Sequence, residues 1–182
     1  RAEHGIELRV HPTLIPEEQL IANVNGVKNA VLVQAHAVGP TLYYGAGAGA
    51  GPTASAVVAD IVDIVRDISY TEDGAGTIPQ LAFEALTDLP ILKREEMTTG
   101  YYLRVDAEDQ TGVLADITTI LSRAGISIDA IMQQSRLKDL IPIVILTDPV
   151  VESKMDDAIA KIQALPAIHG EIVRIRLESL DS

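Results

Sequence analysis

Cysteine and tryptophan are absent from the 182 residues, and the chain contains a single phenylalanine. Without cysteine there are no disulfides, thiolate metal ligands or cysteine nucleophiles, which fits a reducing, cytoplasmic setting. No apolar run reaches the roughly 18 residues of a membrane-spanning helix, and we expect no signal peptide. The polar opening Arg1–His4 follows no initiator methionine, so we expect a piece of a longer chain.

Basic residues are also scarce. Lysine and arginine number 14 against 26 acidic residues, which gives a formal net charge of -12. A chain this acidic repels the phosphate backbone, so nucleic acid is excluded as a partner. No basic amphipathic helix suggests a membrane surface. By contrast, 47% of the residues are hydrophobic, which is enough to bury a sizeable core.

The first half of the chain shows short strand patterns separated by turn signals. Apolar alternation predicts strands over 6–10, 30–34 and 41–44, which would form an antiparallel meander. Pro16 followed by two acidic residues favours a short helix over 16–20. A longer helix, of the kind that packs on a core, is predicted from seven apolar residues on one face: Ala54, Val57, Val58, Ile61, Ile64, Val65 and Ile68.

The second half has a sharper pattern. Strands are predicted over 101–107, 126–133, 141–146 and 173–178, and helices over 113–124 and 155–165. Within the third strand, Pro142 favours an edge position or a strand start. The order β-α-β-β-α-β predicts an α+β fold of the ferredoxin-like kind, with both helices on one face of a four-stranded antiparallel sheet.

A glycine-rich run, Gly45-Ala46-Gly47-Ala48-Gly49-Ala50, lies between a predicted strand and the long predicted helix. It satisfies G-x-G-x-x-A, whose glycines let backbone N–H groups approach a phosphate or a nicotinamide. A dinucleotide-binding fingerprint also needs a parallel second strand ending in an acid, whereas this helix leads into the polar stretch 69–74. Two other interpretations stand beside it: close packing of helix on strand, or a wall against a ligand that other residues bind.

The turn Asp109-Gln110-Thr111-Gly112-Val113-Leu114 opens directly onto a predicted helix. Asp109 or Thr111 can cap that helix, which would make this only a capped turn. Alternatively, Gly112 keeps the backbone open, so that a ligand carboxylate can accept hydrogen bonds from N–H groups of the first helical turn. Spacing alone leaves both interpretations open.

Catalytic and metal-binding patterns are missing from the sequence. The four histidines, at 4, 11, 36 and 169, are isolated and lack metal-ligand spacing. Asp60 with Asp63, and the stretch 155–157, favour solvated helix faces over acid–base pairs. There is no Ser-His-Asp, H-E-x-x-H or P-loop pattern. We therefore predict no catalytic residue and no metal ligand in this chain.

The motif over 109–115, followed by Gly125-Ile126-Ser127-Ile128, resembles that of ACT domains, and the resemblance extends from Tyr101 to Leu177. ACT domains bind amino acids at the turn before the first helix, often across a pair of domains. The resemblance implies an effector site lined by four residues of this turn: Asp109, Gly112, Val113 and Leu114.

Three segments of the first half resemble homoserine dehydrogenase: GIELRVHPTLIP over 5–16, NVNGVKNA over 23–30 and YGAGAGAGPTASAVVAD over 44–60. Residues 90–92 of the joining segment and residues 101–105 also resemble the family. The resemblance implies NAD(P)-dependent reduction of L-aspartate 4-semialdehyde to L-homoserine. In the family, the domain that binds most of the cofactor lies before this stretch, and so do the catalytic groups. No catalytic residue is therefore carried over. Gly49 matches the glycine beside the nicotinamide, and we take Gly47 and Gly49 as cofactor-binding candidates.

The resemblance also implies an organisation and partners. Residues 1–80 would end the substrate and dimerisation domain, 81–99 would connect, and 100–182 would form the ACT domain. We expect a homodimer or homotetramer, threonine as the effector, NAD or NADP as the cofactor, and no turnover by this chain alone. A non-enzymatic amino-acid-sensing subunit is the alternative. A different ACT-bearing enzyme is disfavoured by segments 8–16 and 45–59.

Overall fold

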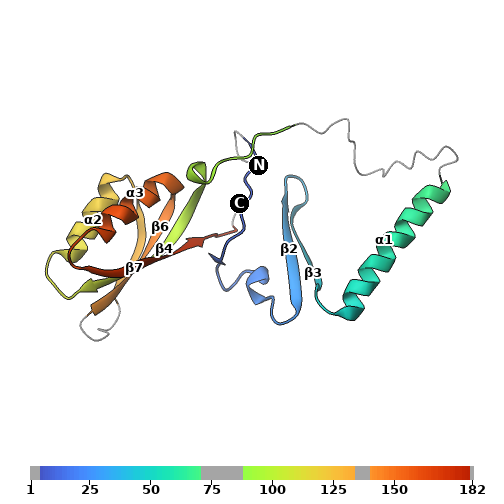
Figure 1. Cartoon of the computed structure of the whole chain (residues 1–182), viewed down its shortest axis with the longest axis horizontal. Coiled ribbons are helices and arrows are strands. Elements are labelled where there is room, and N and C mark those ends of the chain that lie inside the picture. Colours follow the sequence, from blue (N-terminus) through green and yellow to red (C-terminus); the bar gives the residue numbers. More distant parts are fainter. Residues whose placement is uncertain (1–4, 71–87, 134–139, 181–182) are drawn as a thin grey trace. The chain divides into compact units, whose positions relative to one another are not determined.

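The computed structural model describes residues 5–70, 88–133 and 140–180. Two compact units are present, one formed by residues 17–88 and the other by the residues up to 16 together with those from 89 onward. The predicted boundary after residue 80 lies outside the described residues. Residues 5–16 belong to the unit that also contains the residues from 89 onward. The sequence alone predicts them in a first domain over 1–80. Each unit is described by itself below (Figure 1).

The first unit contains a two-stranded antiparallel hairpin. Strands β2 (Lys28–Ala35) and β3 (Gly39–Ala46) pair along their full length, from Lys28 opposite Ala46 to Ala35 opposite Gly39. This confirms the predicted strands over 30–34 and 41–44. The helix predicted over 16–20 is wrong, and a 3-10 turn η1 forms instead over Leu20–Asn23.

The shift of η1 has a local cause in the side chain of Asn23. Its Nδ2 donates hydrogen bonds to the carbonyl oxygens of Glu17 and Gln19, at 3.1 and 3.2 Å. The backbone N–H of Ala22 also donates to the carbonyl of Gln19, at 3.0 Å, which is the short-range bond of a 3-10 turn. These bonds together hold the turn in place.

Helix α1 (Ala50–Tyr70) follows the hairpin directly. Its extent confirms the predicted helix, but its apolar side chains remain exposed. The exposed fractions run from 39% at Val62 to 66% at Ile68. The described residues therefore supply no core for this helix. None of the helices in the described ranges is long and apolar enough to span a membrane.

The second unit is built on a five-stranded sheet in the order β1-β7-β4-β6-β5. The sheet consists of β4 (Thr98–Glu108), β5 (Ile128–Gln133), β6 (Leu140–Val151) and β7 (Ile168–Leu177), with β1 (Thr13–Leu14) added in parallel to β7. Helices α2 (Val113–Arg123) and α3 (Glu152–Gln163) lie side by side over the sheet (Figure 1). This confirms the predicted βαββαβ fold.

The core of this unit lies between the sheet and the two helices. Alternate residues of β4 and β6 point into it, together with the apolar faces of the helices: Tyr101, Leu103, Val105, Ile117, Leu121, Ile143, Ile145, Met155, Ala158 and Ile162. The period-2 and period-3.6 patterns of the sequence thus identify the buried faces correctly.

One strand prediction needs correction, and another is confirmed in one of its two forms, the strand start. The alternation over 6–10 forms only one bridge, between Ile6 and Ile91, and the side chains of Leu8 and Val10 are exposed, so no buried face supports a longer strand. Pro142 is near the start of β6, but β6 lies between β4 and β5 rather than at an edge. In the described residues, the pairing of β6 with β5 extends to Ile143, which lies opposite Gln133.

Candidate functional site

The turn before α2 is closed by Gly112 in a left-handed conformation, with φ at +99°. Gly112 is the N-cap residue, so neither Asp109 nor Thr111 occupies the capping position, and that position offers no side-chain acceptor. Its carbonyl accepts the N–H of Asp116 at 2.9 Å, as the first bond of the helix. The helix start is thus open to an external anion.

The four predicted effector residues are brought together in this turn, but they differ in exposure. Asp109 and Gly112 are exposed, and Leu114 is 39% exposed. Val113 is buried against the core, so it can offer a ligand its backbone N–H but not its side chain.

Glu108 fastens the same turn to the start of β7. Its backbone N–H donates to the carbonyl of Ala167 at 2.9 Å, and one carboxylate oxygen lies 2.8 Å from Nε2 of His169. Its other carboxylate oxygen accepts a hydrogen bond from Gln110. Movement of the turn is therefore linked to the β7 end of the sheet.

The glycine-rich run forms the passage from β3 to α1 in the other unit. Gly49 has a φ of +116°, a conformation that favours glycine, and its carbonyl accepts the N–H of Thr53 at 3.1 Å. Added Cβ atoms at Gly45 and Gly51 would meet nothing within 4 Å. The backbone of this run is thus open to a ligand on one side.

Gly47 has a different reason to be glycine. A Cβ atom there would lie 2.1 Å from Nδ2 of Asn29, which stands on β2. Asn29 therefore packs directly on the glycine-rich run. This contact fixes the position of Asn29 against Gly47 and leaves the three interpretations of the glycine-rich run open.

A buried charge cluster, which sequence reasoning missed, surrounds Glu152 at the start of α3. The side chain of Glu152 is fully buried, and it accepts hydrogen bonds from Tyr101 Oη at 2.7 Å, Arg176 Nε at 3.1 Å and Arg94 Nε at 3.2 Å. Arg174 Nη2 lies 3.5 Å away. The carboxylate is thereby compensated by three arginines and one hydroxyl, as burial of a charge requires.

The environment of Glu152 sets the protonation of the cluster. Burial alone raises the pKa of Glu152, but the hydrogen bonds from Tyr101 and Arg176 and the arginine charges outweigh it and hold that pKa below its ordinary value. Burial, and then the bond to Glu152, raise the pKa of Tyr101. The cluster therefore holds an ionised carboxylate and a neutral phenol at neutral pH.

Asp156, expected on a solvated helix face, instead belongs to the same cluster. It forms ion pairs with Arg174 and with Arg94, the latter at 3.1 Å. Arg94 lies on the 3-10 turn η3 (Arg94–Glu96) of the connecting segment, so Glu152 and Asp156 of α3 both hold that segment. Arg94 is 58 residues from Glu152 and 62 residues from Asp156 in sequence, so no local pattern could have predicted these ion pairs.

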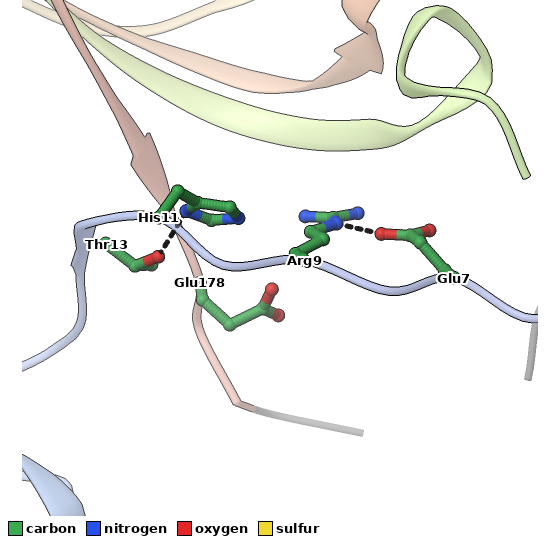
Figure 2. A pocket seen from close by; sticks show the side chains of 5 residues that line it. All are labelled: Glu7, Arg9, His11, Thr13 and Glu178. Carbon is green, nitrogen blue, oxygen red and sulfur yellow. Dashed lines mark hydrogen bonds and ion pairs between the residues drawn. The ribbon is translucent and has the colours of Figure 1, made fainter.

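A cavity of about 360 Å³ lies along residues 7–13 of the same unit (Figure 2). Its lining consists of Glu7, Arg9, His11, Thr13 and Glu178. Arg9 forms an ion pair with Glu7, and His11 Nδ1 lies 2.9 Å from the Thr13 hydroxyl. In the described ranges, no group of three or more His, Asp or Glu side chains could hold a metal ion.

Comparison with known proteins supports both halves of the sequence interpretation. The family model described as homoserine dehydrogenase matches residues 1–62, and the ACT domain model matches residues 101–167. The chain is 54% identical over its whole length to a homoserine dehydrogenase of Pseudomonas aeruginosa, of which it covers 42%. Over its whole length this chain is thus similar to part of a homoserine dehydrogenase. The homoserine dehydrogenase of Neisseria gonorrhoeae is 52% identical over 97% of the chain and is covered to 41%.

A solved structure shows the same similarity. A crystal structure of a homoserine dehydrogenase from Thiobacillus denitrificans matches the whole chain with a TM-score of 0.89 and 57% identity. The chain covers 41% of that structure's length. This chain thus spans about two fifths of the length of the relatives it matches.

Proposed function

We propose that this chain is the C-terminal, regulatory part of a homoserine dehydrogenase that reduces L-aspartate 4-semialdehyde to L-homoserine in threonine, methionine and isoleucine biosynthesis. The observation that carries the proposal is the 54% identity to a homoserine dehydrogenase across all of the chain, glycine-rich run and ACT module included. In this proposal the enzyme acts in the cytoplasm as a homodimer or homotetramer.

The cofactor of the proposed reaction is NAD or NADP, whose reduced form would supply a hydride to the aldehyde carbon while a proton is added to the aldehyde oxygen. Gly47 and Gly49 would form a wall beside the nicotinamide ring, because neither carries a Cβ atom that would hold a flat ligand away from its backbone. Asn29 would hold Gly47 in place from β2. In this proposal, these residues do not select between NAD and NADP.

The proposed regulatory ligand is an amino acid, with threonine as the first candidate. Its carboxylate would accept hydrogen bonds from backbone N–H groups of Val113 and Leu114 at the start of α2, where the helix dipole favours a negative charge. Asp109 is exposed at the same turn and carries the opposite charge to an ammonium group. A free amino acid carries both charges, so the turn suits it better than a simple anion.

The exposed apolar surface of α1 supports a longer enzyme. Six valine and isoleucine side chains of this helix are more than half exposed, which is unusual for a helix in a complete soluble protein. The relatives contain more than twice the length of this chain. In this proposal, α1 packs against the part of the enzyme that this chain does not include.

A turnover assay tests the proposal. Purified full-length gene product should reduce aspartate 4-semialdehyde with concomitant oxidation of NADH or NADPH, followed by absorbance at 340 nm, whereas the 182-residue chain alone should not. A full-length product that binds an amino acid but never oxidises either cofactor would favour the non-enzymatic sensing subunit. Turnover by the 182-residue chain would contradict the placement of the catalytic groups elsewhere.

A further inference from the structure

Two segments that flank the ACT module in this unit, residues 5–14 and residues 89–98, lie next to each other. The N–H of Ile6 donates to the carbonyl of Pro90 at 2.8 Å, and the N–H of Leu92 donates to the carbonyl of Ile6 at 2.9 Å. Arg9 Nη2 donates to the carbonyl of Thr98 at 2.9 Å. The segments 5–14 and 89–98 are therefore fastened to each other within one unit. We call these two segments the joint.

The joint is held on the sheet by β7. Strand β1 pairs in parallel with the end of β7, with Thr13 opposite Arg176, and the N–H of Glu178 donates to the carbonyl of Leu14 at 3.0 Å. Strand β1 lies in the part of the chain that matches the homoserine dehydrogenase family model. The ACT sheet is thus extended by a strand from the dehydrogenase part of the sequence.

The joint is also held on α3 by the charge cluster. The N–H of Glu152 donates to the carbonyl of Met97 at 2.8 Å, so the connecting segment supplies a backbone acceptor to the helix start. Arg94 contributes two ion pairs, to Glu152 at 3.2 Å and to Asp156 at 3.1 Å. Because Glu152 also binds Arg176 of β7, the cluster joins the connecting segment, α3 and β7 at one carboxylate.

Strand β7 has the proposed effector turn at its other end. His169 and Ala167 contact Glu108, the residue just before that turn. One ten-residue strand thus begins beside the effector turn and ends at the joint. Strand β7 pairs with β4 from Ile168 to Leu177, with one register shift, and with β1 at Arg176 and Leu177. Such a paired strand can carry energetic coupling between its two ends.

We propose that β7 and the Glu152 cluster form the coupling element of the feedback response, with Arg94 as the positioning residue that passes the state of the effector turn to the dehydrogenase part. This rests on the proposed function. An effector that changes the position of the turn shifts β7, and the cluster transfers that shift to both segments of the joint. Allosteric couplings of this kind typically change an affinity or activity about 5- to 150-fold.

The Arg94→Gln variant of the full-length protein tests the proposal. The Arg94 side chain is 56% exposed, so the variant should fold, with a melting temperature near that of the wild type. L-threonine should still bind, with a dissociation constant by calorimetry within threefold of wild type, while the activity remaining at saturating L-threonine rises at least fivefold. Arg94→Lys, which keeps the charge but loses the forked geometry, should restore part of the inhibition.

Lys154→Gln is the matched control, since it removes one positive charge at an exposed position of α3 and Lys154 is not part of the Glu152 cluster. It should bind L-threonine and respond to it as the wild type does. Inhibition of Arg94→Gln equal to that of the wild type would overturn the coupling role alone. A wild-type protein that gives no heat with L-threonine would overturn the proposed effector, and the coupling element with it.

Discussion

The side-chain amide of Asn29 occupies the space that a Cβ atom on Gly47 would need, with Nδ2 only 2.1 Å from that position. We therefore expect Gly47→Ala to displace Asn29 and to cost about 1–3 kcal/mol of unfolding free energy, as overpacking commonly does. Denaturant unfolding of the 182-residue chain measures this cost.

The double variant Asn29→Ala with Gly47→Ala separates crowding from other effects. In that pair the Asn29 Cβ would stay 3.4 Å away, an ordinary contact, so the two costs should be non-additive. Gly51→Ala, where the added atom meets nothing, is the control. Strict additivity in the double variant would contradict direct packing of Asn29 on Gly47.

The left-handed conformation of Gly112 gives a second expectation. Its φ of +99° is one that side chains rarely adopt, although the surrounding space is open. Gly112→Ala should therefore lose about 1–3 kcal/mol through backbone strain rather than through a clash. Thr111→Ala, one residue earlier and exposed, should change the unfolding free energy by no more than about 0.5 kcal/mol. Equal effects of the two substitutions would count against this explanation.

Removal of the buried Glu152 charge should be costly and should depend on pH. Glu152→Gln removes the carboxylate that Arg176 binds and leaves Arg94 and Arg174 with Asp156, and breaking a buried pair in this way typically costs about 3–5 kcal/mol at neutral pH. Because the folded pKa of Glu152 is lowered, its contribution is present above the ordinary pKa of 4.5 and is lost as the pH falls through the folded value.

Unfolding curves at a series of pH values measure this dependence. The difference between wild type and Glu152→Gln should be constant near neutral pH and should shrink below about pH 4.5, where the Glu152 carboxylate of the unfolded wild-type chain begins to protonate. Glu171→Gln, at an exposed position of β7, should show neither effect. A difference that stays constant down to pH 2 would mean that the charge of Glu152 is not what stabilises the cluster.

The apolar face of α1 should respond differently in the short and the full-length proteins. Ile64 is 59% exposed in this chain, so Ile64→Lys should change the unfolding free energy of the 182-residue chain by about 0.5 kcal/mol or less. In the full-length enzyme the same substitution should cost several times more, because it would bury an unpaired charge. Asp60→Lys on the polar face is the control. Equal effects in both proteins would contradict a covered α1.

Local periodicity was enough to predict most of the ACT module, because the buried face of each helix and strand can be identified from its own sequence. The alternation Tyr101, Leu103 and Val105 needed no distant information. The segment 6–10 shows the limit of this reasoning, since its alternation is equally regular but only Ile6 finds a partner strand. Whether an alternating segment pairs depends on an edge elsewhere in the chain, which periodicity does not contain.

The candidate sites were predictable to different degrees. The turn 109–114 and the glycine-rich run are local motifs, so the sequence indicated them, although it left a capped turn as an alternative that Gly112 at the N-cap position now disfavours. The Glu152 cluster joins residues from η3, β4, α3 and β7, and its acid carries no local motif. Only the tertiary structure could bring Arg94 to Glu152.

The central claim is that an amino acid binds at the turn closed by Gly112. Calorimetric titration of L-threonine into the full-length protein and into its Gly112→Asp variant tests it most directly. An added carboxylate at this helix start should repel the ligand carboxylate, so we expect saturable heat from the wild type and none from the variant. Equal heats from both proteins would contradict the claim that this turn is the effector site.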